Sequence, residues 1–210
     1  GGEGTRFFPR GRANAPKQFI ELFPGGKTLI QLAIDRLRDP NGPATIIIQT
    51  NAKYHDLVAE AVKDYPEYKE GKILIYGEPA YADNCAALYY AISKIEKDLG
   101  ADKVVEMYTA DHYVPETDYP KFSATIQRLS NLALTQPYIG VVGIRPRRDD
   151  TGFGHHRVKQ TVPTEGLFAS DFVEKPKQDV IDGWRKSGEY NSLPEERDDA
   201  KNKYFWNAGY

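Results

Sequence analysis

The organisation of the chain follows from its first nineteen residues, which include Gly1-Gly2-Glu3-Gly4-Thr5-Arg6, then Pro9, then Ala15-Pro16-Lys17-Gln18-Phe19. Three glycines in the first four positions let the backbone turn tightly and bring its N–H groups close to an anion. Arg6 carries a fork of donors that suits phosphate oxygens, and Lys17 carries a mobile charge for a second phosphate. The P-loop pattern G-x-x-x-x-G-K-[ST] is absent. Taken alone, the glycine run leaves a phosphate-binding loop and a flexible surface turn both open.

Downstream of this stretch, apolar strand-like runs alternate with helical patterns. The runs predict strands at 44–50, 73–76, 104–108 and 138–144. Apolar spacing predicts helices at 29–37, capped by Thr28, and at 54–65, 85–99 and 122–134. This alternation indicates an α/β fold with a mostly parallel central sheet flanked by helices. Ligands of such sheets bind at the carboxyl ends of the strands, where we expect the glycine loop, Glu78 and Asp111.

After Arg145 the pattern changes to shorter segments. We expect strands around 156–160 and 167–174, a helix at 180–187 that stops at Gly188, and a charged loop or exposed helix over 185–203. Four scattered histidines and one cysteine do not suggest a zinc site, so we expect His155-His156 to lie at an exposed strand end.

Composition excludes several classes of protein. The net charge of -2 gives no general attraction to nucleic acid or to an anionic membrane surface. No apolar run approaches the roughly 20 residues needed to span a bilayer, and nothing resembles a signal peptide. The single cysteine, Cys85, fits a reducing compartment. We therefore expect a soluble cytoplasmic protein that binds neither nucleic acid nor membrane, and a homodimer is compatible with the sequence.

Five segments in order resemble those of the sugar-nucleotide pyrophosphorylases, and within them the mannose-1-phosphate guanylyltransferases. The opening is similar to their GGxGTRxxP…PKQF stretch, and the other four segments are Thr109-Ala110-Asp111-His112, Thr151-Gly152-Phe153-Gly154, Phe172-Val173-Glu174-Lys175-Pro176 and Tyr204-Phe205-Trp206-Asn207-Ala208-Gly209. The resemblance implies a Rossmann-like nucleotidyltransferase fold with a smaller sugar-binding β region. We expect one catalytic domain over 1–210, with a nucleotide-binding half (1–144) and a sugar-binding half (145–210), truncated at both ends.

The resemblance also implies roles for individual residues. It implies that GTP and a hexose 1-phosphate are the substrates, that Arg6, Lys17 and Asp111 are catalytic, and that Asp111 binds Mg²⁺. From its position alone, Asp111 could equally cap the turn that follows it. The implied nucleotide-binding residues are Gly1, Gly2, Gly4, Thr5, Arg6, Glu78, Asp83 and Asn84. The implied sugar-phosphate-binding residues are Gly154, Glu174, Lys175 and Asn207.

One segment near the nucleotide departs from the family. Where the guanylyltransferases carry EPxxRNTAPA, this chain has Glu78-Pro79-Ala80-Tyr81-Ala82-Asp83-Asn84-Cys85-Ala86-Ala87. Asp83 beside a triphosphate would be repulsive unless it faces the base or a metal ion. Two alternatives to a guanylyltransferase therefore stay open: a pyrophosphorylase for another nucleotide and sugar phosphate, and a non-catalytic sugar-nucleotide sensor.

Overall fold

The computed structural model describes residues 16–23, 25–38, 44–80, 83–135, 139–162, 166–191 and 202–209. The chain divides into two compact units, 1–131 and 132–210, and each is described by itself. Gly1, Gly2, Gly4, Thr5 and Arg6 lie outside the described residues. Among the helices of the described part, none is both long enough and apolar enough to cross a membrane.

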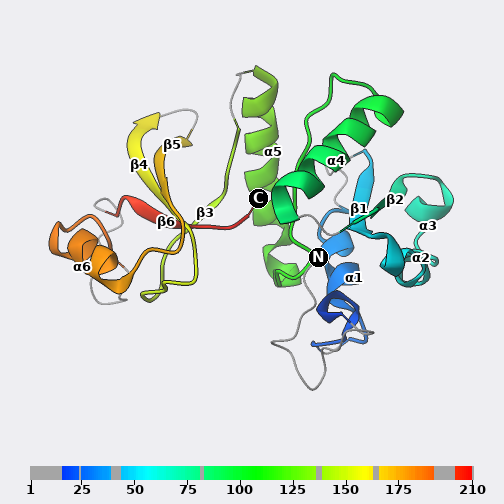
Figure 1. Ribbon diagram of the computed structural model, residues 1–210, viewed down its shortest axis with the longest axis horizontal. Coiled ribbons are helices and arrows are strands. Elements are labelled where there is room, and N and C mark those ends of the chain that lie inside the picture. Colours follow the sequence, from blue (N-terminus) through cyan, green and yellow to red (C-terminus); the bar gives the residue numbers. More distant parts are fainter. Residues whose placement is uncertain are drawn as a thin grey trace. The chain divides into compact units, whose positions relative to one another are not determined.

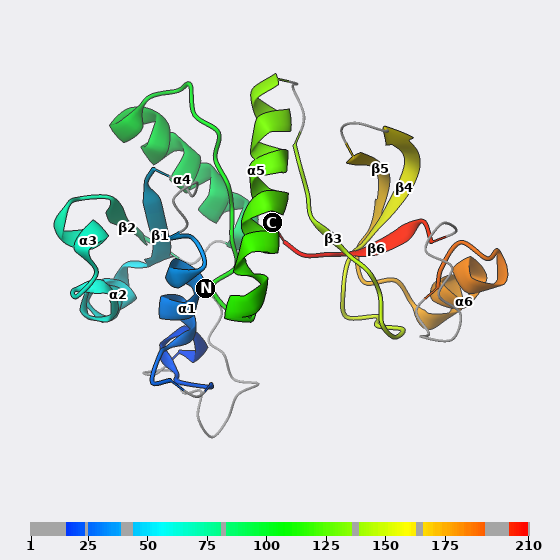
Figure 2. The ribbon, with the colours of Figure 1, turned by 180° about the vertical axis from the view of Figure 1, so that it is seen from behind.

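The first unit contains a parallel strand pair. Strand β1 (Ile46–Asn51) lies beside β2 (Ile73–Glu78), with Ile46 opposite Ile73 and Asn51 opposite Glu78. The connection between them contains η3 (Ala52–Tyr54), α2 (His55–Val62) and α3 (Pro66–Lys69). Figures 1 and 2 show β1 and β2 side by side, with α2 and α3 next to β2. The parallel pairing and the intervening helix confirm the predicted α/β class.

Helix α1 (Leu29–Asp35) begins with a reciprocal cap. Thr28 Oγ1 accepts a hydrogen bond from the backbone N–H of Gln31, and Gln31 Oε1 accepts one from the backbone N–H of Thr28. This capping box satisfies N–H groups that the first helical turn cannot satisfy internally, and it confirms the predicted cap. The buried core of this unit consists of Ile30, Ile34, Val58, Val62 and Ile73.

The strand expected at 104–108 is absent. Among the described residues this segment makes no ladder with another strand, and it has no regular secondary structure between α4 (Asp83–Leu99) and η4 (Glu116–Asp118). Glu106 of this segment accepts a hydrogen bond from Ser130 of α5 (Tyr119–Thr135), and within the segment it accepts one from Tyr108 at 2.5 Å. An apolar run becomes a strand only where a neighbouring strand offers hydrogen-bond partners.

The second unit contains an antiparallel sheet of order β3-β6-β4-β5. Its strands are β3 (Gly143–Ile144), β4 (His155–Val162), β5 (Gly166–Val173) and β6 (Tyr204–Asn207). The strands predicted at 156–160 and 167–174 are confirmed. Of the run expected at 138–144, the structure describes residues 139–144, and among these only the last two form a strand. The β4–β5 register shifts around Val158, which marks a bulge beyond the first residues of β4.

Helix α6 (Gln178–Lys186) packs beside this sheet and is followed by Gly188, whose φ of 74° is the left-handed conformation expected after a helix end. The buried core here is Ile181, Tyr190 and Tyr204, with Trp184 packed against it. Most of the charged stretch expected to be solvated, 192–201, lies outside the described residues.

The expectation of an exposed His155 is wrong. Its side chain is 1% exposed, and its ring lies 5.4 Å from that of Trp184 and 5.8 Å from that of Tyr190. The reason is strand alternation, because neighbouring residues of a strand point to opposite faces. His155 faces α6, and His156 faces the other way.

Candidate active site

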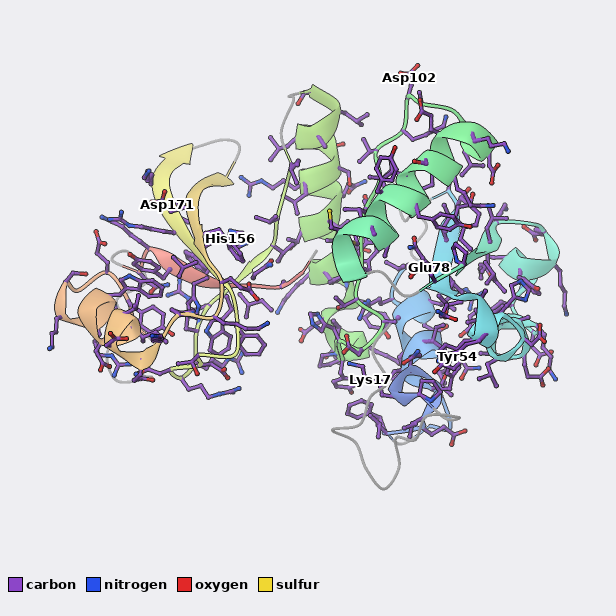
Figure 3. The ribbon with its side chains drawn as sticks, viewed as in Figure 1. Lys17, Tyr54, Glu78, Asp102, His156 and Asp171 are labelled. Atoms are coloured by element: carbon purple, nitrogen blue, oxygen red, sulfur yellow. The ribbon has the colours of Figure 1, made fainter. Side chains whose placement is uncertain are left out.

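Lys17 and Asp111 form an ion pair within the first unit. Lys17, which is labelled in Figure 3, begins the 3-10 helix η2 (Lys17–Phe19). Asp111 lies in a turn shortly after the segment 104–108. Their side chains are 27% and 34% exposed, so both remain accessible to a ligand. The structure therefore brings together the two described residues for which a catalytic role is expected.

The environment of this pair favours an ionised Asp111. Burial alone would raise the pKa of its carboxyl, but the hydrogen bond and charge of Lys17 outweigh burial and lower that pKa below its usual value. The pKa of neighbouring His112 is also lowered, first by burial and then by the charges of Arg36 and Lys17, against the opposing charge of Asp111. At neutral pH the turn thus carries a carboxylate beside a neutral imidazole.

Arg36 anchors the turn that carries Asp111. Its guanidinium donates to the backbone carbonyls of Thr109 and His112, both at 2.6 Å, and it lies 5.5 Å from the ring centroid of Phe122. Arg36 is only 2% exposed. Hydrogen bonds on both sides of Asp111 restrict the turn, so Arg36 is a positioning residue for that carboxylate.

Sequence reasoning misses Arg36, although one signal marks it. Arg36 follows Ala33 by three positions and Leu32 by four, so it lies on the apolar face of the predicted helix. A charged residue on such a face needs buried partners. A second contact that sequence reasoning misses is the stacking of Phe23 on Tyr113, with ring centroids 3.9 Å apart, which joins the segment after Lys17 to the segment after Asp111.

Glu78 lies at the carboxyl end of β2, as expected, but it is 7% exposed. It accepts a hydrogen bond from Gln49 Nε2 at 2.9 Å, and the same nitrogen donates to the carbonyl of Ala87 in α4 at 2.5 Å. Gln49 therefore ties β1, β2 and α4 together where the two strands end (Figure 3 labels Glu78). Asp83 and Asn84 begin α4, and their side chains lie outside the described residues.

The second unit gathers all four residues for which a sugar-phosphate role is expected. The backbone N–H of Asn207 donates to the carbonyl of Gly154 at 2.8 Å. A Cβ added to Gly154 would lie 2.8 Å from Glu174 Oε2, and Lys175 Nζ lies 3.0 Å from Glu174 Oε1. Three strands meet here, because Gly154 precedes β4, Glu174 follows β5 and Asn207 ends β6. A side chain at position 154 would therefore require Glu174 to shift, which favours glycine there.

Lys175 has a strained backbone. Its φ of 44° is the one positive value at a non-glycine residue in the described ranges. This left-handed conformation costs an L-residue about 1–2 kcal/mol, and such strain is concentrated at functional sites. The Lys175 side chain is 63% exposed at the end of β5, which suits a cation that awaits an anionic ligand.

Among the described residues, one carboxylate, that of Asp111, is suitable as a ligand to Mg²⁺. In the described part of the chain, no three His, Cys, Asp or Glu side chains gather into a site that could hold a metal ion. Mg²⁺, however, is commonly bound by one or two carboxylates together with substrate phosphates and water. Asp111 therefore fits as a single protein ligand to Mg²⁺ that enters with a nucleotide.

Comparison with known proteins agrees with these motifs. A Vibrio cholerae protein that carries the provisional name mannose-1-phosphate guanylyltransferase is 30% identical over 213 residues. The mannose-1-phosphate guanylyltransferase RfbM of Salmonella typhimurium is 27% identical over 210 residues, and that of Sinorhizobium fredii is 26% identical over 209. Each comparison covers 100% of this chain but only 40%, 39% and 37% of the relative, respectively.

The chain also matches a protein-family profile over almost its whole length. Residues 1–206 match the profile of the nucleotidyl transferase family. This match reaches into both units of the structure, and it includes the Lys17–Asp111 pair together with Gly154, Glu174 and Lys175. The chain therefore belongs to the nucleotidyl transferase family.

Proposed function

We propose that the protein transfers a guanylyl group from GTP to mannose 1-phosphate, which gives GDP-mannose and pyrophosphate. The names of the relatives support these substrates. The observation that carries the proposal is the meeting of Lys17 with Asp111, because nucleotidyl transfer needs a cation and a metal-binding carboxylate at one place.

The chemistry requires little activation of the nucleophile. A phosphate oxygen of the sugar 1-phosphate attacks the α-phosphorus of GTP, and the bond from that phosphorus to the β-phosphate oxygen breaks as pyrophosphate leaves. Because the attacking oxygen is already anionic, no general base is needed. The demands on the protein are in-line positioning and neutralisation of the phosphates.

The residues divide these demands between them. The backbone of the Gly1–Gly4 loop, with Thr5 and Arg6, would hold the β- and γ-phosphates that leave. Lys17 would neutralise charge that develops at the α-phosphate. Lys175 would hold the phosphate of the incoming sugar, and Glu174 and Asn207 would bind its hydroxyls. Mg²⁺ bound to Asp111 would supply further neutralisation of the triphosphate.

The ion pair between Lys17 and Asp111 has a consequence for ligand entry. While Lys17 donates to Asp111, the two groups neutralise each other. A triphosphate offers Lys17 a better partner than one carboxylate, because it carries several anionic oxygens. Nucleotide binding would therefore exchange the partner of Lys17 and free the carboxylate for the metal ion.

A pyrophosphorylase for another nucleotide and sugar phosphate is the second candidate. The departure at Ala82, Asp83, Asn84 and Ala86 favours it, because this segment lies near the nucleotide in the family that the chain resembles. A non-catalytic sensor is less well supported, since binding alone does not require Arg6, Lys17, Asp111 and Lys175 together.

The test is an assay of pyrophosphate release with Mg²⁺ and mannose 1-phosphate that compares GTP, ATP, UTP and CTP. Turnover with GTP well above the others supports the proposal, whereas preference for another triphosphate supports the second candidate. Absence of turnover with mannose 1-phosphate, glucose 1-phosphate and other hexose 1-phosphates, together with tight binding of GDP-mannose, would identify a sensor. The Lys17→Ala variant serves as the control for contaminating activity.

A further inference from the structure

The antiparallel sheet of the second unit has two different faces. His155 lies opposite Val173 and Trp206, and its ring packs against Trp184 of α6. His156 lies opposite Phe172 and Phe205, so these three side chains belong to the other face. One face thus supports the buried core with α6, and the second face presents His156, Phe172 and Phe205.

The second face leads directly to the expected sugar-binding residues. Glu174 follows Phe172 by two positions and Asn207 follows Phe205 by two, which is the spacing of side chains on one face. Contacts agree with this spacing. A Cβ at Gly154 would lie 2.5 Å from Phe172 Cζ and 2.8 Å from Glu174 Oε2, so the ring and the carboxylate border the same point.

Phe172 is both exposed and supported. It is 48% exposed. Its ring leans on that of His156, with centroids 4.9 Å apart, and His156 Nε2 is buried with no hydrogen-bond partner in the described part of the chain. His156 therefore packs against one side of the Phe172 ring, and the opposite side of that ring remains accessible to a ligand.

An exposed aromatic ring beside a carboxylate matches the surface of a hexose. A pyranose ring carries hydroxyl groups at its rim and C–H groups on its faces. Aromatic rings cover apolar C–H surface, and carboxylates accept hydrogen bonds from hydroxyls. Ligand sites commonly combine apolar walls with a few polar groups in this way.

We propose that Phe172 is a sugar-contacting, specificity-determining residue. Its ring covers one C–H face of the hexose, while Glu174 and Asn207 bind hydroxyls and Lys175 binds the phosphate. The inference rests on the proposed function, because it assumes that a hexose 1-phosphate is the ligand of this cluster. It adds an apolar contact to a site otherwise made of polar groups.

The test measures dissociation constants of mannose 1-phosphate and of inorganic phosphate by calorimetry on the full chain. Phe172→Ala should weaken mannose 1-phosphate binding about tenfold and change inorganic phosphate binding by less than about twofold. Phe172→Tyr keeps the ring and should bind like the wild type, whereas Phe172→Leu keeps only apolar bulk and should resemble Phe172→Ala. Phe153→Ala is the matched control, because Phe153 is 41% exposed but packs against Trp206, which belongs to the α6-facing side.

Three results would overturn the inference: unchanged mannose 1-phosphate affinity in Phe172→Ala, an equal loss of phosphate affinity in that variant, or no binding of any hexose 1-phosphate by the wild type. A different result would refute the proposed function and leave this inference intact. If the wild type binds mannose 1-phosphate through Phe172 but turns over no triphosphate, the inference stands and the transferase proposal falls.

Discussion

Lys17 and Asp111 form an ion pair although 94 positions separate them in the sequence. Both side chains are about one-third exposed, so solvent screens the pair and its contribution to the free energy of unfolding is at most about 1 kcal/mol. A contact this weak in stability yields readily to a ligand. The pair therefore contributes little to the stability of the fold, and its proposed role is in ligand binding.

Replacing either member should separate activity from stability. Lys17→Ala and Asp111→Ala should each lower turnover about 100-fold or more, because each removes charge stabilisation of the phosphates. The free energy of unfolding should change by less than about 1 kcal/mol. Pyrophosphate release and urea unfolding measure the two effects. Lys27→Ala, which breaks the 2.6 Å pair with Asp35, is the control, and near wild-type turnover in Asp111→Ala would refute the role of that carboxylate.

Arg36→Met should destabilise the first unit by about 3 kcal/mol, because two carbonyls lose their charged donor in a buried setting. Arg36→Lys should recover part of this loss. Urea unfolding followed by circular dichroism measures the change. Arg38→Met is the matched control, since Arg38 is exposed and its 2.7 Å pair with Glu67 should contribute less than about 1 kcal/mol.

Loss of Arg36 should also affect Asp111 itself. In folded Arg36→Lys, the Mg²⁺ concentration that gives half-maximal turnover should rise, because the turn that carries the carboxylate is less restricted. A purely structural role for Arg36 would lower the midpoint of unfolding and leave this Mg²⁺ dependence unchanged.

Burial of His155 should make the second unit less stable at mildly acidic pH. Burial lowers the pKa of His155, against the opposing influence of the Phe153 carbonyl and of Asp149 and Asp150. Above about pH 6.5 both the folded and the unfolded state are neutral at this residue, so its full contribution is present. As pH falls below that value, the unfolded state binds a proton that the folded state does not, and the free energy of unfolding falls until the folded pKa is reached.

The measurement is urea unfolding between pH 7.5 and 5.5. The chain's two tryptophans, Trp184 and Trp206, both lie in the second unit, so their fluorescence reports on that unit. His155→Phe keeps an aromatic ring and should show a flatter pH dependence than the wild type. His55→Gln, at an exposed position of the first unit, should retain the wild-type slope, and equal slopes in wild type and His155→Phe would contradict the assignment.

The left-handed backbone of Lys175 allows binding and stability to be changed in opposite directions. Lys175→Gly should raise the free energy of unfolding by about 1 kcal/mol, because glycine adopts a positive φ without strain. The same substitution removes the cationic side chain. Lys175→Met removes the cation and keeps the strain. Both variants should lose mannose 1-phosphate affinity by about tenfold or more, and calorimetry together with thermal unfolding distinguishes them. Retained affinity in both variants would exclude Lys175 as the phosphate ligand.

Gly154→Ala should impair binding more than folding. The added methyl group would displace the end of the Glu174 side chain and the ring of Phe172. Because both are about half exposed, they can shift toward solvent, so the stability loss should stay near 1 kcal/mol. Affinity for mannose 1-phosphate should fall about tenfold, because the displaced groups form the proposed site. Gly183→Ala is the control: it meets nothing within 4 Å and should stabilise α6 by about 0.5–1 kcal/mol.

Local sequence patterns predict most of the elements. The β-branched run Ile46-Ile47-Ile48 indicates β1 because such residues fit a pleated, buried surface, and Thr28 indicates the start of α1 through its side-chain oxygen. The segment at 104–108 has the same apolar character, yet it forms no strand in the described structure. Whether such a run pairs depends on what lies beside it, which no local pattern contains.

The candidate site, too, is only partly predictable from local sequence patterns. Sequence motifs identify Lys17 and Asp111, but the motifs do not show that Arg36 holds the carbonyls on either side of Asp111. They also do not show that Phe172 approaches Gly154, because that contact depends on the register between β4 and β5. Short patterns thus suggest which residues bind a ligand, whereas the residues that position them depend on contacts between distant segments.

The bulge around Val158 separates the tip of the β4–β5 hairpin from the residues near Gly154, so an insertion or deletion at the tip need not change the strand register there. A shift of one residue in a strand moves every side chain to the opposite face, and here it would exchange His155 with His156. The register changes between Arg157 and Gln160, beyond the residues that align Phe172 with its neighbours. An insertion or deletion toward the hairpin tip can be absorbed at this irregularity. Homologous chains should therefore vary in length beyond the bulge and keep a constant spacing between Gly154 and Arg157.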